Sequence, residues 1–475
     1  MALALQSGAR LSARDCVVVG FIGLAAGALA AVAGPVAGIL VAVGTLGLLG
    51  SAYTPGLVFA AYLFVGFYKG ALQAYSPIDL TILLALASAI QIVPLLFDRR
   101  ERHMPIWGIA LWTGLALLIL GGAIYAPDQS LALNKVALWW ALVFLAMIPA
   151  AIRVGSEERY IRQFVLAFFC MGALVVVVGV AALSPTERLV VLGENTIEVS
   201  RAALLVPLLG VAYVARQSSR PLLVMAVVLT PPAFVVALAS GSRGPLIFLA
   251  LLGVVAAIRS LARPSSVDWR LAGVAAGLAV ASIVLISVAA TQLPGESISR
   301  FGSFADFAQD EASGTASGTS ADLSSAIRVS LSDLAITLFE EHPLLGVGTG
   351  GYEYLSPRYL PPKEAEPYPH NALLQLAAEF GVVGVVVFAG LVAFALTRRL
   401  PQCPSVRAVR VLYLFFLLNS LVSTDIYTDR ATWGVLLLLL VIDMRPVIRR
   451  RGEIAGPTRG SANGTTERPS PGFAV

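Results

Sequence analysis

Long apolar runs alternate with short polar segments along most of the chain. A window of about twenty residues, the length of a helix that crosses the hydrocarbon core of a bilayer, finds about fourteen such runs. Backbone groups must be paired inside lipid, and no alternating strand pattern is present, so we expect an all-α transmembrane bundle of about 12–14 spans. The predicted spans lie near 16–33, 36–50, 54–69, 77–97, 104–125, 133–152, 160–183, 201–215, 221–239, 244–258, 269–293, 371–396, 409–424 and 432–444.

Composition agrees with this pattern. The 475 residues are 57% hydrophobic and 13% charged, and the mean hydropathy is +0.83. These values exclude an ordinary soluble protein. Cys16, Cys170 and Cys403 lie far apart in or beside apolar segments and lack metal-ligand spacing, so we expect neither a disulfide framework nor a metal site from them.

The basic residues are concentrated in alternate loops. With the amino terminus in the cytoplasm, the loops on that side contain most of the 33 Lys and Arg residues, as the positive-inside rule requires. This orientation also places the carboxyl terminus in the cytoplasm. The net charge of +5 therefore reflects membrane topology. It is no argument for a nucleic-acid partner, since no basic patch is interleaved with aromatic residues.

One predicted loop, residues 294–370 on the outer face, is much longer than the others. Within it, residues 324–343 place apolar side chains at helical spacing, which predicts an amphipathic helix lying against the bundle. The GVGTGGYEYLSP segment at 346–357 is expected to be a glycine-rich turn region leading into prolines. Its GVGTGG part lacks the Lys and Ser/Thr of a phosphate-binding P-loop. We predict a membrane bundle over 1–452 and a disordered cytoplasmic tail over 453–475.

Several ionisable or polar residues lie beside predicted spans on the outer face. Arg201 starts one span, and Arg243 lies in a short turn between two apolar spans. His370 and Asn371 begin a third span, and Arg430 lies between the last two. Charged groups at membrane depth are costly and tend to mark function. Each has a simpler alternative: Arg201 can extend to the membrane interface, and His370 can cap its helix beside Asn371.

Together, the arginines and the histidine indicate the type of reaction that the site performs. Two arginines on one face suit a phosphate-bearing ligand through bidentate contacts. A nearby histidine can move a proton near neutral pH. A transfer reaction outside the cytoplasm has no ATP, so its substrate must bring its own leaving group. Membrane-bound polyprenyl-diphosphate sugars do so.

The segment HPLLGVGTGGYEYLSPRYLPPKEAEPYPHNALLQLAAEFGVVGVVVF, residues 342–388, resembles the signature region of the O-antigen ligase and O-antigen polymerase (Wzy-type) superfamily. The shared pattern is a proline-led GVG-G turn, a variable stretch, an H-N-x-x-L motif and a glutamate before a G-x-x-G helix. Arg328 in the amphipathic helix and the SGSRGPLIFL segment fit the same layout. The resemblance covers roughly residues 190–445.

The resemblance implies a metal-independent glycosyltransferase without a cofactor, with a GT-C-like fold, in the bacterial inner membrane and acting on the periplasmic side. It would transfer a glycan from undecaprenyl diphosphate to an acceptor hydroxyl. His370 would be the base, and Arg201 and Arg243 would hold the diphosphate. Further contributors on the loop side of the site would be Arg328, Tyr352, Asn371 and Arg430.

The acceptor stays open at this point. A ligase uses lipid A-core, a polymerase uses a second lipid-linked glycan, and a third member of the superfamily uses protein hydroxyls. A different class, a lipid-linked oligosaccharide flippase, also has about fourteen spans. A flippase is expected to line a central cavity with charges across the bilayer and to have short loops. Here one outer loop is long and the outward charges gather at one face, which favours the enzyme.

Overall fold

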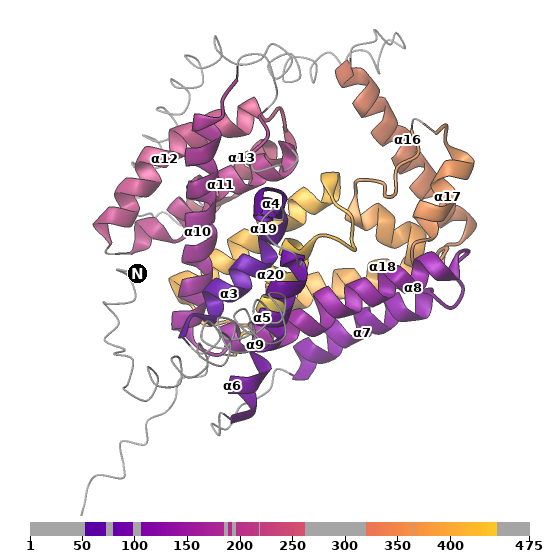
Figure 1. Ribbon diagram of the computed structural model, residues 1–475, viewed down its shortest axis with the longest axis horizontal. Coiled ribbons are helices and arrows are strands. Elements are labelled where there is room, and N and C mark those ends of the chain that lie inside the picture. Colours follow the sequence, from indigo (N-terminus) through magenta and orange to yellow (C-terminus); the bar gives the residue numbers. More distant parts are fainter. Residues whose placement is uncertain are drawn as a thin grey trace, which may run out of the picture.

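The computed structural model describes residues 53–72, 79–97, 106–184, 189–191, 196–217, 219–261, 320–362 and 364–443. Within these ranges the protein is all-helical, as the sequence predicts (Figure 1). The predicted spans near 16–33, 36–50 and 269–293 and the predicted tail over 453–475 lie outside the described residues.

The chain order of the helices falls into two runs. The first run is α3 (Pro55–Leu63), α4 (Val65–Leu72), α5 (Leu80–Ala89), α6 (Ile92–Phe97), α7 (Ile106–Gly122), α8 (Gln129–Trp139), the π-helical η3 (Trp140–Leu145), α9 (Ala146–Gly155) and α10 (Glu158–Ala181). The second run is α11 (Thr196–Ala212), the 3-10 turn η4 (Val214–Arg216), α12 (Arg220–Ala239), α13 (Gly244–Leu261), α16 (Ser320–Glu341), α17 (Gly351–Tyr359), α18 (Ala372–Thr397), α19 (Pro404–Ser423) and α20 (Arg430–Val441).

Six helical stretches in the described part are long and apolar enough to cross a membrane, which defines a multi-pass membrane protein. They are Gln129–Gly155, Glu158–Ala181, Thr196–Arg216, Arg220–Ala239, Ala372–Thr397 and Pro404–Ser423. Shorter apolar helices occupy the predicted spans near 77–97, 104–125, 244–258 and 432–444.

Two predicted spans are interrupted. The span near 54–69 is divided at Phe64 into α3 and α4, and the span near 77–97 is divided after Ile90 into α5 and α6. Pro94 accounts for the second break, because a proline lacks the N–H that an α-helix needs and its ring clashes with the carbonyl four residues earlier.

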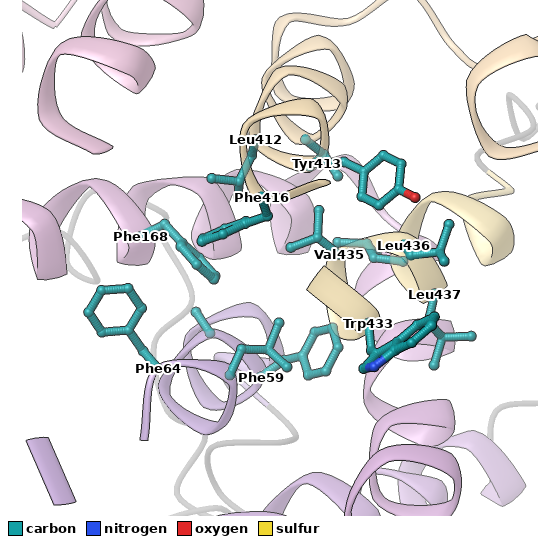
Figure 2. Packing of buried hydrophobic residues seen from close by; sticks show 14 of the residues in the cluster. Phe59, Phe64, Phe168, Leu412, Tyr413, Phe416, Trp433, Val435, Leu436 and Leu437 are labelled. Atoms are coloured by element: carbon teal, nitrogen blue, oxygen red, sulfur yellow. The ribbon is translucent and has the colours of Figure 1, made fainter. Parts of the chain in front are cut away.

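The short helix α20 forms the centre of the core. Every residue from Val435 to Leu440 is 0% exposed, so this helix is surrounded by protein on all sides. Figure 2 shows its Trp433 and Val435 facing side chains of α3, α10 and α19, among them Phe59, Phe168 and Phe416. A helix enclosed in this way need not match the thickness of the bilayer, which accounts for its 12 residues.

The predicted amphipathic helix is confirmed as α16. Its apolar face, which includes Leu331, Leu334 and Leu338, is buried against α17 and α18. In Figure 1 these helices lie on the right of the bundle, with α12 and α13 on the left.

The expectation of an irregular turn after the glycines was wrong for Gly351–Tyr359, which forms α17. Tyr352 is fully buried and donates its hydroxyl hydrogen to the carbonyl oxygen of Leu331 in α16, at 2.8 Å. This tertiary packing outweighs the low helix propensity of glycine and proline.

The long helix α18 is broken at Gly381, whose φ of 61° and ψ of −155° are not helical. Four backbone hydrogen bonds join the break to the segment over residues 343–348. They run from the N–H of Val347 to Ala378, Gly348 to Glu379, Val382 to Pro343 and Val383 to Leu344, at 2.9, 2.9, 2.8 and 3.4 Å. The segment over residues 343–348 thus forms the hydrogen bonds that the backbone groups at the break cannot form within α18. Inside a membrane such backbone groups must be paired within the protein.

Candidate active site

Arg201 lies inside a helix and not at its start, because α11 begins at Thr196. Its side chain is buried at 5% exposure and forms an ion pair with Glu198 at 2.5 Å. Its Nη2 atom donates to three acceptors at the end of α19: Ser423 Oγ at 2.6 Å, Thr424 Oγ1 at 3.0 Å and the carbonyl oxygen of Asn419 at 3.1 Å. Arg201 thus joins α11 to the carboxyl end of α19.

A cavity of about 220 Å³ lies beside Arg201, where α19 ends and α20 begins. Arg430 and Tyr368 line it together with Arg201. Its wall also includes three acidic side chains and an apolar part. The acidic residues are Glu198, Asp425 and Asp429, and the large apolar ones are Leu63, Phe64, Phe67 and Phe416.

The two aspartates of this cavity are held by the protein itself. Asp425 Oδ1 accepts hydrogen bonds from Gln375 Nε2 at 2.9 Å and from the backbone N–H of Tyr427 at 3.2 Å. Asp429 caps α20 by accepting from the backbone N–H of Thr432 at 3.0 Å and from its hydroxyl at 2.6 Å. These hydrogen bonds fix the loop over residues 424–429.

His370 directly precedes α18 and has a left-handed backbone, with φ of 56°; within the described ranges no other non-glycine residue has a positive φ. Such a conformation is uncommon outside glycine and is found disproportionately at functional sites. Asn371 caps the helix, because its Oδ1 accepts from the backbone N–H of Leu373 and Leu374 at 3.0 and 3.1 Å. The capping alternative therefore holds for Asn371 and not for His370.

The Nδ1 atom of His370 is buried and has no hydrogen-bond partner among the described residues. The ring packs edge to face on Tyr368, with ring centroids 4.5 Å apart. Burial, and then the positive charge of Arg328, lower the pKa of His370 from 6.5 to about 4. The imidazole is therefore neutral at pH 7, in the form that accepts a proton.

Tyr368 links His370 to the cavity, since its ring touches the histidine and also lines the cavity wall. Burial raises the pKa of Tyr368, and the positive charges of Arg328 and Arg201 act in the opposite direction. Both arginines therefore lie close enough to act electrostatically on this tyrosine. The structure brings Arg201, Arg328, His370 and Arg430 around one tyrosine that the sequence analysis did not single out.

Of the predicted site residues, Arg201 and Arg430 line the cavity, whereas His370, Arg243, Arg328, Tyr352 and Asn371 do not. Arg243 occupies the turn between α12 and α13, as predicted, and its neighbour Gly244 packs against Val422 near the end of α19. Arg201 and Arg243 thus approach the same end of α19 from different helices. Tyr352 is buried between α16 and α17, so it acts on the framework of the loop.

Sequence reasoning also missed a polar stripe on α18, formed by Asn371, Gln375 and Glu379 at four-residue spacing. Gln375 Oε1 accepts the backbone N–H of Ile426 at 3.0 Å. Glu379 Oε2 accepts the backbone N–H of Gly350 at 3.1 Å and the hydroxyl of Tyr427. The signal in the sequence that could have revealed this stripe is the pair Gln375 and Glu379, which share one face of an otherwise apolar helix.

The helices define a multi-pass membrane protein, and the cavity places ionisable groups of both signs at the ends of its helices. Residues 225–389 match the model of the family described as O-antigen ligase. This match confirms, over these residues, the resemblance seen in the sequence. Arg243, Arg328 and His370 lie within the matched segment, whereas Arg201 and Arg430 flank it. No curated protein matches the sequence.

Proposed function

We propose that the protein transfers a glycan from undecaprenyl diphosphate to an acceptor hydroxyl, as an O-antigen ligase or polysaccharide polymerase does. The observation that carries the proposal is the position of His370. Its neutral ring, with a buried and unpartnered Nδ1, packs on Tyr368, which lines a cavity with two arginines. The O-antigen ligase family domain supports the same type of transfer.

In the proposed step, the acceptor oxygen forms a bond to the anomeric carbon of the glycan. The bond from that carbon to the diphosphate oxygen breaks, and its electron pair leaves with undecaprenyl diphosphate. The proton of the acceptor hydroxyl passes to His370, which acts as the general base. Removing this proton as the new bond forms raises the nucleophilicity of the acceptor oxygen.

Arg201 and Arg243 are proposed to hold the diphosphate and to stabilise the charge that develops as it leaves. The position of Arg201 on the cavity wall supports this role. Guanidinium groups would supply the positive charge, so the proposed reaction is metal-independent.

The other predicted contributors act on the loop side of the site. Burial, and then the positive charge of Arg328, lower the pKa of His370 and keep it neutral, and Asn371 fixes the start of α18 beside it. Tyr352 holds α16 on α17.

We further propose that both termini are cytoplasmic and that the site faces the periplasm of a bacterial inner membrane. The concentration of basic residues in alternate loops supports this orientation. The acceptor would be lipid A-core or a second lipid-linked glycan. A protein hydroxyl is the alternative acceptor.

The test is a transfer assay in membranes with a lipid-linked glycan donor and each of the three acceptors in turn. His370→Ala should abolish transfer to the true acceptor, with His342→Ala as the matched control, because His342 is exposed in the same segment. Undiminished transfer by His370→Ala would defeat the assignment of the base. Retained transfer after combined Arg201→Ala and Arg243→Ala would defeat the diphosphate clamp.

A further inference from the structure

The charged side chains that line the cavity beside Arg201 are all held by protein partners except one. Arg201 is paired with Glu198, and Asp425 and Asp429 are hydrogen-bonded within their own loop. The guanidinium of Arg430 has no ion pair or side-chain hydrogen bond within the described ranges, and it lies on the cavity wall. Arg430 is therefore the charged group of this wall whose side-chain donors the described part of the protein leaves unengaged.

The place of Arg430 in its helix makes this charge more unusual. Arg430 is the first residue of α20, and the amino terminus of a helix carries the positive end of the helix dipole. The carboxylate of Asp429 caps this terminus by accepting from the backbone N–H and the hydroxyl of Thr432. The donors of Arg430 are what remains at this end of α20 for an anion in the cavity.

The size and lining of the cavity restrict the anion. Ligand sites for drug-sized molecules are about 300–1,000 Å³, so a cavity of about 220 Å³ fits a head group and not a whole glycan. The wall contains ionic residues and also the apolar residues Leu63, Phe64, Phe67 and Phe416. A phosphate group attached to an apolar chain matches both kinds of lining.

We propose that Arg430 binds a phosphate of the lipid-linked donor directly, as the main cationic contact in this cavity. Arg201, whose Nη atoms are engaged by Glu198 and by α19, holds the end of α19 in place beside it. The inference rests on the proposed function, since it adds a further arginine to the two that are proposed to hold the donor's diphosphate.

The test measures binding of farnesyl diphosphate to the purified full-length protein in detergent micelles. Inorganic pyrophosphate and farnesol are the comparison ligands, which separate the contributions of the phosphates and of the apolar chain. The variants are Arg430→Gln, Arg430→Lys and, as a matched control, Arg407→Gln, which removes an exposed arginine from the other end of α19. Elution as a single species and an unchanged melting temperature establish that each variant is folded.

Wild-type protein and the Arg407→Gln variant should bind farnesyl diphosphate equally. Arg430→Gln should weaken binding about tenfold or more, and Arg430→Lys should weaken it less, because lysine keeps the charge but not the bidentate geometry. In the transfer assay the Arg430→Gln variant should show a raised KM for the donor and an unchanged KM for the acceptor.

Two other outcomes separate the inference from the proposed function. If wild type binds farnesyl diphosphate and Arg430→Gln binds it equally well, the role of Arg430 is overturned while the proposed function stands. If wild type binds none of the diphosphates, the lipid-diphosphate donor itself is wrong, and the role of Arg430 falls with it.

Discussion

The rings of Tyr368 and His370 meet edge to face, with centroids 4.5 Å apart and planes inclined by 61°. An aromatic pair of this geometry contributes about 0.5–1.5 kcal/mol beyond its buried area. We therefore expect Tyr368→Ala to lower kcat of the transfer by about tenfold, because the imidazole loses the surface that orients it. Tyr368→Phe should retain most of the activity, since it keeps the ring. Equal losses in the two variants would show that the hydroxyl matters and that the ring contact does not.

The pH dependence of transfer tests the environment of His370. A base works only when unprotonated, and burial together with Arg328 lowers the pKa of His370 to about 4. Activity should therefore persist through pH 6.5 and be lost as the pH falls through about 4. Arg328→Gln removes the repelling charge, so the pKa rises and the acid limb of the kcat/KM profile moves to higher pH.

The matched control for this pH profile is Arg358→Gln, which removes an exposed arginine from α17. Its acid limb should stay where the wild-type limb lies. An acid limb near pH 6.5 in the wild type, unmoved by Arg328→Gln, would contradict the proposed role of Arg328.

Gly346→Ala should prevent normal folding. Gly346 has φ of +68°, and a Cβ atom there would lie 2.3 Å from the backbone carbon of Glu379 in α18. The backbone strain alone costs about 1–3 kcal/mol, and the contact would push α18 away from the glycine-rich segment. Melting temperature and the folded fraction on size exclusion measure the effect. Gly390→Ala is the control, since nothing lies within 4 Å of a Cβ there and this helical position should tolerate alanine.

Glu379 joins the glycine-rich turn to the loop between α19 and α20 through Gly350 and Tyr427. Glu379→Leu leaves both donors buried without an acceptor and should destabilise the fold by about 2 kcal/mol or more. Glu379→Gln keeps a side-chain oxygen and should cost less. Thermal unfolding of Glu379→Leu, Tyr427→Phe and the double variant measures the coupling. The double variant should lose less than the sum of the single losses, and strict additivity would show that the two side chains act independently.

The predicted spans and the observed helices agree best where an apolar run is bounded by polar capping residues. The span predicted near 371–396 is α18, Ala372–Thr397, and Asn371 is its cap. The break of α18 at Gly381 was not predictable, because a lone glycine is compatible with a continuous helix. Only the neighbouring segment over 343–348, which pairs with the open backbone groups, makes the break stable.

The candidate site shows the same division between features that the sequence predicts and features that only the structure reveals. The sequence located His370, Arg201 and Arg243 beside spans, because charged groups are rare in apolar surroundings and stand out. It could not show that Arg201 binds Ser423, a residue 222 positions away. The sequence also did not identify Tyr368, because a single tyrosine in a proline-rich loop belongs to no recognisable motif or spacing.

The sequence by itself determined that this protein is helical and crosses a membrane, that residues 324–343 form an amphipathic helix, and that residues 342–388 resemble the O-antigen ligase superfamily. Hydropathy and local spacing suffice for these conclusions because each is a property of neighbouring residues. The tertiary structure alone decided that α20 is the enclosed centre of the bundle, that Asn371 and not His370 is the cap, and that Arg430 is the unpaired cation of the cavity within the described ranges. The enclosure of α20 and the place of Arg430 depend on contacts between residues that lie far apart in the sequence. Only the packing of the helices brings such residues together.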